Sequence, residues 1–132
     1  GGFFLDETVL PPAVSATVWL LAARELDCAY TWHAGVAAAR AAGIDPALID
    51  SLQHGQPSTA ATAENNRLFD FCRQLMRGNH HIDDKTYATI VAQFGIPAAV
   101  QIAATLGYVV MMSLIANAFG IAPAADNSGP AL

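Results

Sequence analysis

The chain has 132 residues, of which 54% are hydrophobic and 13% are charged, and its formal net charge is −5 at pH 7. This length fits one domain with a single core. Because only six residues are Lys or Arg and they form no basic stripe, nucleic acid and anionic membranes are excluded as expected partners. The low charged fraction predicts that other subunits cover part of the surface, so we expect a homo-oligomer.

The cysteines and the N-terminal residues bear on the compartment. Cys28 and Cys72 are too few for a disulfide framework and fall in helical patterns. Residues 1–10 have no basic region followed by an apolar stretch, so a reduced cytoplasmic protein is predicted. Residues 98–119 are long and apolar enough to suggest a membrane span. Polar residues interrupt this stretch and no Lys or Arg flanks it, so we expect a buried helix and no membrane partner.

The hydrophobic spacing predicts an all-α domain, because no segment alternates with period two. Residues 1–10 are expected to form an irregular lead-in before Pro11-Pro12. The first helix is expected over residues 12 to about 27, since prolines suit the first turn of a helix. The second is expected over residues 29–42, where Gly43 ends it.

Capping signals divide the rest of the chain into four further helices. They are expected over residues 46–52, from Thr59 or Thr62 to Arg77, from Asp83 or Asp84 to Phe94, and over residues 98–119. Residues 121–132 contain prolines, glycines and small polar residues, which predicts a disordered tail. The sequence therefore predicts one compact domain of six helices over residues 11–120.

Short motifs spread over most of the chain occur in a recognisable order. They are Pro11-Pro12, the stretches 23–30, 37–43, 84–87, 106–108 and 117–119, and the pairs Trp32-His33 and Asn79-His80. In this order they resemble the carboxymuconolactone decarboxylase-like superfamily, which includes the alkylhydroperoxidase D-like proteins. The resemblance implies an oligomeric all-α domain of that type. Members usually carry more helical sequence before the Pro-Pro element than this chain does.

The resemblance also indicates where a site would lie and what is different here. Members commonly have a glutamate at the position of Ala16, a cysteine or glutamate at that of Thr31, and a histidine at that of Gly35. All three acid–base positions are therefore without a titratable side chain. Residues 28, 31 and 35 share one helix face. Because Thr31 cannot form a disulfide with Cys28, Cys-x-x-Cys peroxidase chemistry is not expected.

Small, uncharged residues at the three positions predict a wide and mostly apolar cavity. The residues expected to line this cavity and bind the substrate are Ala16, Tyr30, Thr31, Trp32 and Gly35. Aromatic walls suit an apolar or aromatic-type small molecule, and no cofactor or metal is expected. The alternative is a site that has lost its function and drifted, but such a site would tend to refill with larger apolar residues, because an empty cavity lowers stability.

Two side chains are candidate catalytic groups. Cys28 is a candidate nucleophile, and His33 is a candidate base, although it points about 200° around the helix from position 31. The alternatives are a buried core cysteine and a histidine that packs or contacts another subunit. The segment 80–84, with two histidines and two aspartates, lies between helices, where caps are expected, so no metal site is predicted. Glu25, next to Arg24, is interpreted as a residue in a structural ion pair or a capping role rather than as a buried acid.

Three functions follow in order of preference. The first is a small-molecule enzyme of this superfamily with an uncharged pocket, acting by isomerisation, cyclisation, elimination or decarboxylation. Such a lyase, isomerase or cyclase would depend on positioning its ligand more than on a strong acid or base. The second is a catalytically silent ligand-binding or partner subunit. The third, least favoured, is a thiol redox protein that uses Cys28 with Cys72.

Overall fold

The computed structural model describes residues 10–123, which form six helices and no strands. In chain order the helices are α1 (Pro12–Glu25), α2 (Ala29–Ala41), α3 (Pro46–His54), α4 (Ala63–Met76), α5 (Asp84–Phe94) and α6 (Ile96–Phe119). The prediction of an all-α chain with six helices is confirmed for these residues. The lead-in expected over residues 1–9 and the tail expected over 124–132 lie outside the described residues.

Side-chain caps decide where two helices begin. The Thr62 hydroxyl accepts a hydrogen bond from the Asn65 N–H at 3.0 Å, and the Asn65 side chain accepts one from the Thr62 N–H at 3.0 Å. This reciprocal pair satisfies two N–H groups that the first turn of α4 leaves free. At α5 the Asp83 carboxylate accepts from the Thr86 N–H at 2.7 Å. Of the alternative caps considered, Thr62 and Asp83 are therefore the ones used.

The helix boundaries differ from the predicted ones by a few residues, for local reasons. Helix α1 ends at Glu25 because Asp27 takes a positive φ of 50° in the turn to α2, outside the right-handed helical region. Helix α6 begins at Ile96, before the position expected. Pro97 lies in its first turn, where a backbone N–H has no partner inside the helix and its loss costs little.

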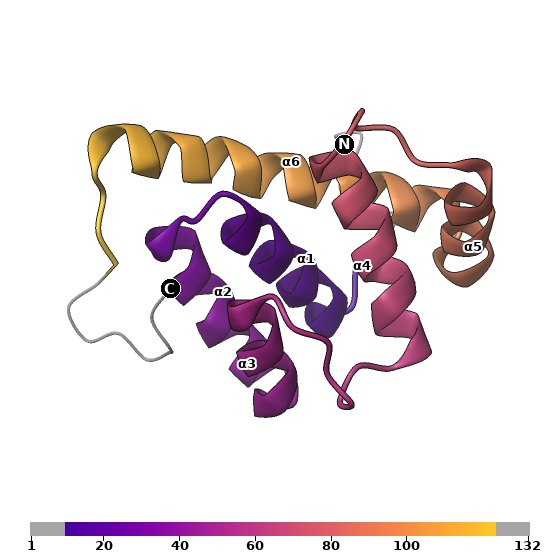
Figure 1. The fold of residues 1–132 in the computed structure, drawn as a ribbon, viewed down its shortest axis with the longest axis horizontal. Helices are drawn as coiled ribbons and strands as arrows, with labels where there is room; N and C mark the ends of the chain where they lie inside the picture. Colours follow the sequence, from indigo (N-terminus) through magenta and orange to yellow (C-terminus); the bar gives the residue numbers. More distant parts are fainter. Residues whose placement is uncertain (1–9, 124–132) are drawn as a thin grey trace.

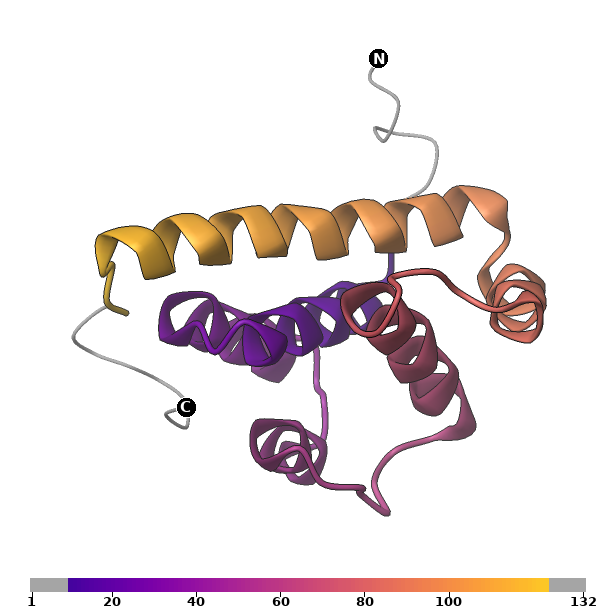
Figure 2. The ribbon, with the colours of Figure 1, turned by 45° about the horizontal axis from the view of Figure 1, so that its top comes forward.

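Helix α1 lies at the centre of the fold and contacts α2, α3, α4 and α6 (Figure 1). Figure 2 shows α6 as the longest element, lying across α1 and α2 and reaching α5 at its N-terminal end. The core forms where these helices meet. Its largest fully buried apolar side chains are Val18, Leu20, Trp32, Val36, Leu68, Ile90, Ile102 and Val109.

The expectation that the last long helix is buried is wrong for its outer face. Only 28% of the most apolar 18-residue window of α6 is buried. The inner face, with Ile102, Leu106 and Val109, packs on the core, whereas Tyr108, Leu114 and several other large apolar side chains are exposed. Among the described residues, α6 is the one helix that is long and apolar enough to cross a membrane, judged by length and composition alone.

Candidate functional site

The residues of the predicted site lie at the junction of α1, α2 and α6. The Thr31 hydroxyl on α2 lies 2.7 Å from the Ser113 hydroxyl on α6, and both side chains are fully buried. The Thr31 hydroxyl also lies 3.4 Å from the Cys28 carbonyl oxygen. Because protein groups already satisfy this hydroxyl, it serves as a structural contact between helices. In the sequence, Ser113 is one of the polar residues that interrupt the apolar stretch 98–119, and nothing in the spacing pairs it with Thr31.

Trp19 connects the same three helices. Its indole N–H, on α1, donates a hydrogen bond to the Thr31 carbonyl oxygen on α2 at 2.8 Å. Its ring lies against Tyr108 of α6, with ring centroids 5.9 Å apart and planes tilted by 58°. A partly buried indole with its N–H bonded fixes the position of the ring. Trp19 therefore occupies space beside α2 in one defined orientation.

The cavity that the sequence predicts is closed at Gly35, which corrects that expectation. A Cβ atom placed on Gly35 would lie 2.8 Å from Trp19 Cδ1 and 2.9 Å from Leu20 Cδ2. Both distances are below van der Waals contact, so side chains of α1 already fill the volume that a larger residue would need. Ala16 and Cys28 are buried as well. The small residues at these positions allow α1 and α2 to pack closely.

The two aromatic residues expected to line the pocket diverge. Trp32 is fully buried in the core, whereas Tyr30 is 37% exposed. Residues two apart on a helix lie about 200° apart around its axis, so these two side chains leave α2 on different sides. They do not form one shared aromatic wall.

Among the described residues, His33 makes one hydrogen bond, which is local. Its Nδ1 lies 2.8 Å from the Ala29 carbonyl oxygen, one turn earlier on α2. If Nδ1 carries the proton and donates to this oxygen, Nε2 is an acceptor. Nε2 is buried and has no hydrogen-bond partner among the described residues. Among the described residues no hydrogen bond links His33 to Cys28, so the two candidate catalytic groups do not form a hydrogen-bonded pair.

The two cysteines are both free and buried. Burial raises the pKa of the Cys72 thiol on α4 to about 12, so the reactive thiolate is strongly disfavoured at neutral pH. Cys28 occupies the N-cap position of α2, and its side chain makes no capping hydrogen bond. This arrangement supplies no thiol pair of the kind that disulfide exchange needs.

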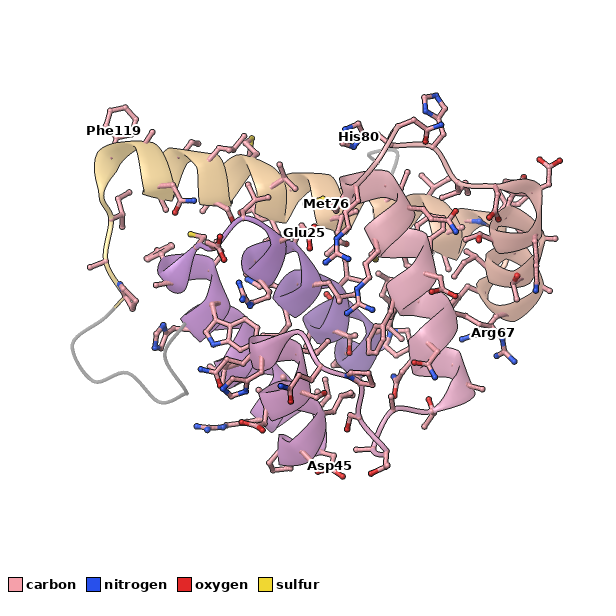
Figure 3. The ribbon with its side chains drawn as sticks, viewed as in Figure 1. Glu25, Asp45, Arg67, Met76, His80 and Phe119 are labelled. Carbon is pink, nitrogen blue, oxygen red and sulfur yellow. The ribbon has the colours of Figure 1, made fainter. Side chains whose placement is uncertain are left out.

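Glu25 forms a structural ion pair, which is one of the two roles expected for it, but its partner is Arg77 rather than the adjacent Arg24. Glu25 binds Arg77 in a two-point contact, with distances of 2.5 Å and 2.8 Å, which ties the end of α1 to the end of α4 (Figure 3). This hydrogen-bonded contact holds the pKa of the Arg77 guanidinium above its usual value. Arg24 instead pairs with Asp27 and donates to the Gln53 carbonyl oxygen at 2.7 Å. The Glu25–Arg77 partners are 52 residues apart, a distance over which spacing gives no signal.

A surface hollow of about 430 Å³ lies between the end of α3, the loop that follows it, and α4. We call it the Arg73 cleft. It is lined by Ser51, Leu52, Gly55, Gln56, Pro57, Ser58, Ala61, Asn66, Phe69, Arg73 and Arg77. None of the seven residues proposed from the sequence as catalytic or substrate-binding belongs to it. In the sequence, Arg73 is one more cation near a helix end, and nothing in the spacing marks a cleft.

The histidine-rich segment before α5 uses its side chains for local contacts. His80 Nδ1 lies 2.9 Å from the Leu75 carbonyl oxygen, and His81 Nδ1 lies 2.7 Å from the Asn79 carbonyl oxygen. Asp83 caps α5, as described above. Within residues 10–123 no group of three or more His, Cys, Asp or Glu side chains is placed to hold a metal ion.

Comparisons with models of known protein families, with curated proteins and with solved structures gave no match to this chain. The superfamily resemblance stays a prediction from the sequence motifs.

Proposed function

We propose that the chain acts as a catalytically silent subunit that associates with further copies of itself through the outer face of α6. This proposal is based on the outer face of α6, which is apolar and exposed along its whole length. Its large exposed side chains are Ile96, Val100, Tyr108, Met111, Leu114, Ile115 and Phe119. Exposed apolar surface of this extent is typical of a region that another molecule covers.

A second copy of the chain is the occupant that the face fits best. No Asp, Glu, Lys or Arg occurs between Thr86 and Ala125, so two identical faces bring no like charges together. Gly107 lies exposed on the same helix, and a Cβ placed there meets nothing within 4 Å. Glycine inside a helix costs about 1 kcal/mol relative to alanine, and an absent side chain allows another helix to approach the backbone closely.

A lipid bilayer fits the same face less well. Helix α6 packs along its inner side on α1, α2 and α5, so lipid cannot surround it while the fold stays intact. The helix also lacks flanking Lys or Arg side chains that would contact lipid headgroups. Its polar side chains point to protein partners, as when Asn117 donates to the Leu26 carbonyl oxygen at 2.9 Å.

Catalytic silence is supported by the packing of the predicted site. The positions that carry acids and bases in the superfamily that the chain resembles hold Ala16, Thr31 and Gly35 here. An enzyme acting at this place would need α1 and α2 to separate around Trp19, whose indole is bonded to Thr31. The silent-subunit function needs no such opening.

Sedimentation velocity on matched variants tests the proposal. Leu114→Glu places a charge on the outer face of α6, where Leu114 is 56% exposed, and Tyr87→Glu does the same on α5, where Tyr87 is 52% exposed. We expect the unaltered chain and Tyr87→Glu to sediment as the same oligomer and Leu114→Glu as a monomer. An oligomer that survives Leu114→Glu contradicts the proposal. So does an unaltered chain that is monomeric in buffer and binds phosphatidylcholine vesicles, because the face then serves a membrane.

A further inference from the structure

Arg73 is a cation held in place without an anionic partner. Its guanidinium lies over the Phe69 ring, 5.3 Å from the ring centroid. Among the described residues its side chain makes no ion pair and no hydrogen bond, and Asp70, on the preceding turn of α4, forms no ion pair with it. Stacking on an aromatic ring fixes the plane of a guanidinium and leaves its N–H groups free for a planar anion.

The surroundings of Arg73 leave its positive charge uncompensated. No carboxylate lines the Arg73 cleft. The second arginine there, Arg77, is already neutralised by its two-point contact with Glu25. The cleft therefore presents one unmatched cation, on a chain whose overall charge is −5. Because the rest of the molecule repels anions, an anion that binds is attracted by this local charge rather than by the net charge.

The remaining lining is divided between apolar and amide groups. Leu52 and Phe69 are buried side chains at the floor of the cleft, and Pro57 adds an apolar edge. The amides of Gln56 and Asn66 lie on its rim, and neither makes a side-chain hydrogen bond among the described residues. The volume of about 430 Å³ falls within the range of small-molecule sites. An apolar floor with a few polar groups at the edge is the usual composition of such sites.

From these contacts we propose that the Arg73 cleft binds a small organic monocarboxylate. The carboxylate accepts two parallel hydrogen bonds from the free N–H groups of Arg73. Its apolar body packs on Leu52 and Phe69, and the rim amides bond any polar substituent. One unmatched arginine selects one carboxylate, and the apolar floor selects a hydrocarbon body over a bare inorganic anion. This binding is independent of association through α6, which lies elsewhere on the fold (Figure 1).

Benzoate is a suitable probe, because it combines a single carboxylate with a flat apolar body. Titration of the ¹⁵N-labelled chain with benzoate at constant ionic strength should shift the amide resonances of the cleft saturably. The expected Kd is at or below about 1 mM, which is reasonable for a ligand of this size. Benzamide, which has nearly the same shape but no charge, should bind at least about tenfold more weakly, since a hydrogen bond to a charged group is the stronger kind.

Two variants locate the binding, and a third is the matched control. Arg73→Gln should weaken benzoate binding at least about tenfold. The benzoate affinity of Arg73→Lys should lie between those of Arg73→Gln and the unaltered chain, because a lysine keeps the charge and loses the two-point contact. Arg67→Gln removes an arginine of the same helix that does not line the cleft and that bonds Gln93 on α5 at 2.9 Å. Figure 3 shows Arg67 beside α5. It should leave benzoate affinity unchanged.

Four results overturn the proposal. They are the absence of saturable cleft shifts, equal affinities for benzamide and benzoate, an Arg73→Gln affinity equal to that of the unaltered chain, and an equal loss in Arg67→Gln. If Arg73 serves only to complement the C-terminal end of α4, Arg73→Gln lowers the urea midpoint and leaves the benzoate Kd unchanged. The two measurements on one variant therefore separate a ligand anchor from a structural cation. Repeating the titration on Leu114→Glu keeps this outcome separate from the oligomer question.

Discussion

The Thr31 hydroxyl on α2 and the Ser113 hydroxyl on α6 lie 2.7 Å apart, 82 residues apart in sequence and fully buried. Each supplies the partner that the other needs away from water, since buried polar groups without a hydrogen bond are costly. The contact also joins α6 to the body of the fold at the place where the sequence predicts an open pocket. What the sequence indicates as a remodelled binding position is a contact between two helices.

This contact predicts non-additive losses of stability. Thr31→Val should lower the free energy of unfolding by about 1–3 kcal/mol, because it leaves the Ser113 hydroxyl buried with no partner. Ser113→Ala should do the same from the other side. The double variant should lose clearly less free energy of unfolding than the two single variants lose together, because the effects of substitutions at residues in contact are not additive. Urea unfolding of the four proteins at one protein concentration gives the coupling energy, and strictly additive losses would show that the hydroxyls do not interact.

Two glycines inside helices should respond to alanine with opposite signs. Gly35→Ala gains helix propensity of about 1 kcal/mol, but its methyl group meets Trp19 and Leu20, and overpacking of this kind costs about 1–3 kcal/mol. We expect a net loss of stability. Gly107→Ala has open space around it and should gain about 0.5–1 kcal/mol in the monomer.

Urea unfolding in dilute solution, where association is weak, measures both variants. A stabilised Gly35→Ala protein would indicate that space remains beside α2, as the predicted cavity requires. A destabilised Gly107→Ala monomer would indicate a neighbour at that position which the structure lacks.

The buried thiol of Cys72 should be unreactive in the folded protein. With a pKa of about 12, about one thiol in ten thousand is ionised at pH 8, and burial blocks access as well. In Cys28→Ser, where Cys72 is the remaining thiol, a disulfide reagent at pH 8 should react only as fast as the protein unfolds. The same sample in urea gives the control rate. Rapid labelling of the native variant contradicts the assigned burial.

The cap of α5 predicts how stability responds to acid. Hydrogen bonds from Thr86 hold the pKa of the Asp83 carboxyl below the value of about 3.9 for an unfolded aspartate. A carboxyl whose pKa is lower in the folded protein than in the unfolded one stabilises the fold. This stabilisation is fully present above the pKa of the unfolded state and is lost as the pH falls through the pKa of the folded state. Asp83→Asn keeps a capping oxygen but does not titrate, so its stability should fall less steeply below about pH 4. Equal slopes in urea unfolding from pH 7 to pH 3 would contradict this.

Local patterns predict the helices of this chain well. The signals at Pro12, Gly43, Thr62 and Asp83 each act within one turn of a helix. The sequence alone therefore locates the six helices to within a few residues. The misplaced ends have local causes too, such as the positive φ of Asp27, which a non-glycine residue adopts rarely.

The site could not be predicted in the same way, because it depends on contacts between distant segments. Whether Gly35 faces an open space or Trp19 depends on how α1 and α2 cross, and the spacing of residues on one helix says nothing about that. The partner of Glu25 and the isolation of Arg73 likewise depend on α4 lying beside α1. The apolar composition of α6 was visible in the sequence, but its exposure follows only from which elements pack on it.

If the proposed function is right, another copy of the chain covers the outer face of α6. Static light scattering of the unaltered protein across a range of concentrations, in buffer without detergent or lipid, tests it most directly. We expect a molar mass of at least two chains of 13.8 kDa each, decreasing on dilution. A mass of 13.8 kDa at every concentration, from a protein that remains folded and soluble, would contradict it.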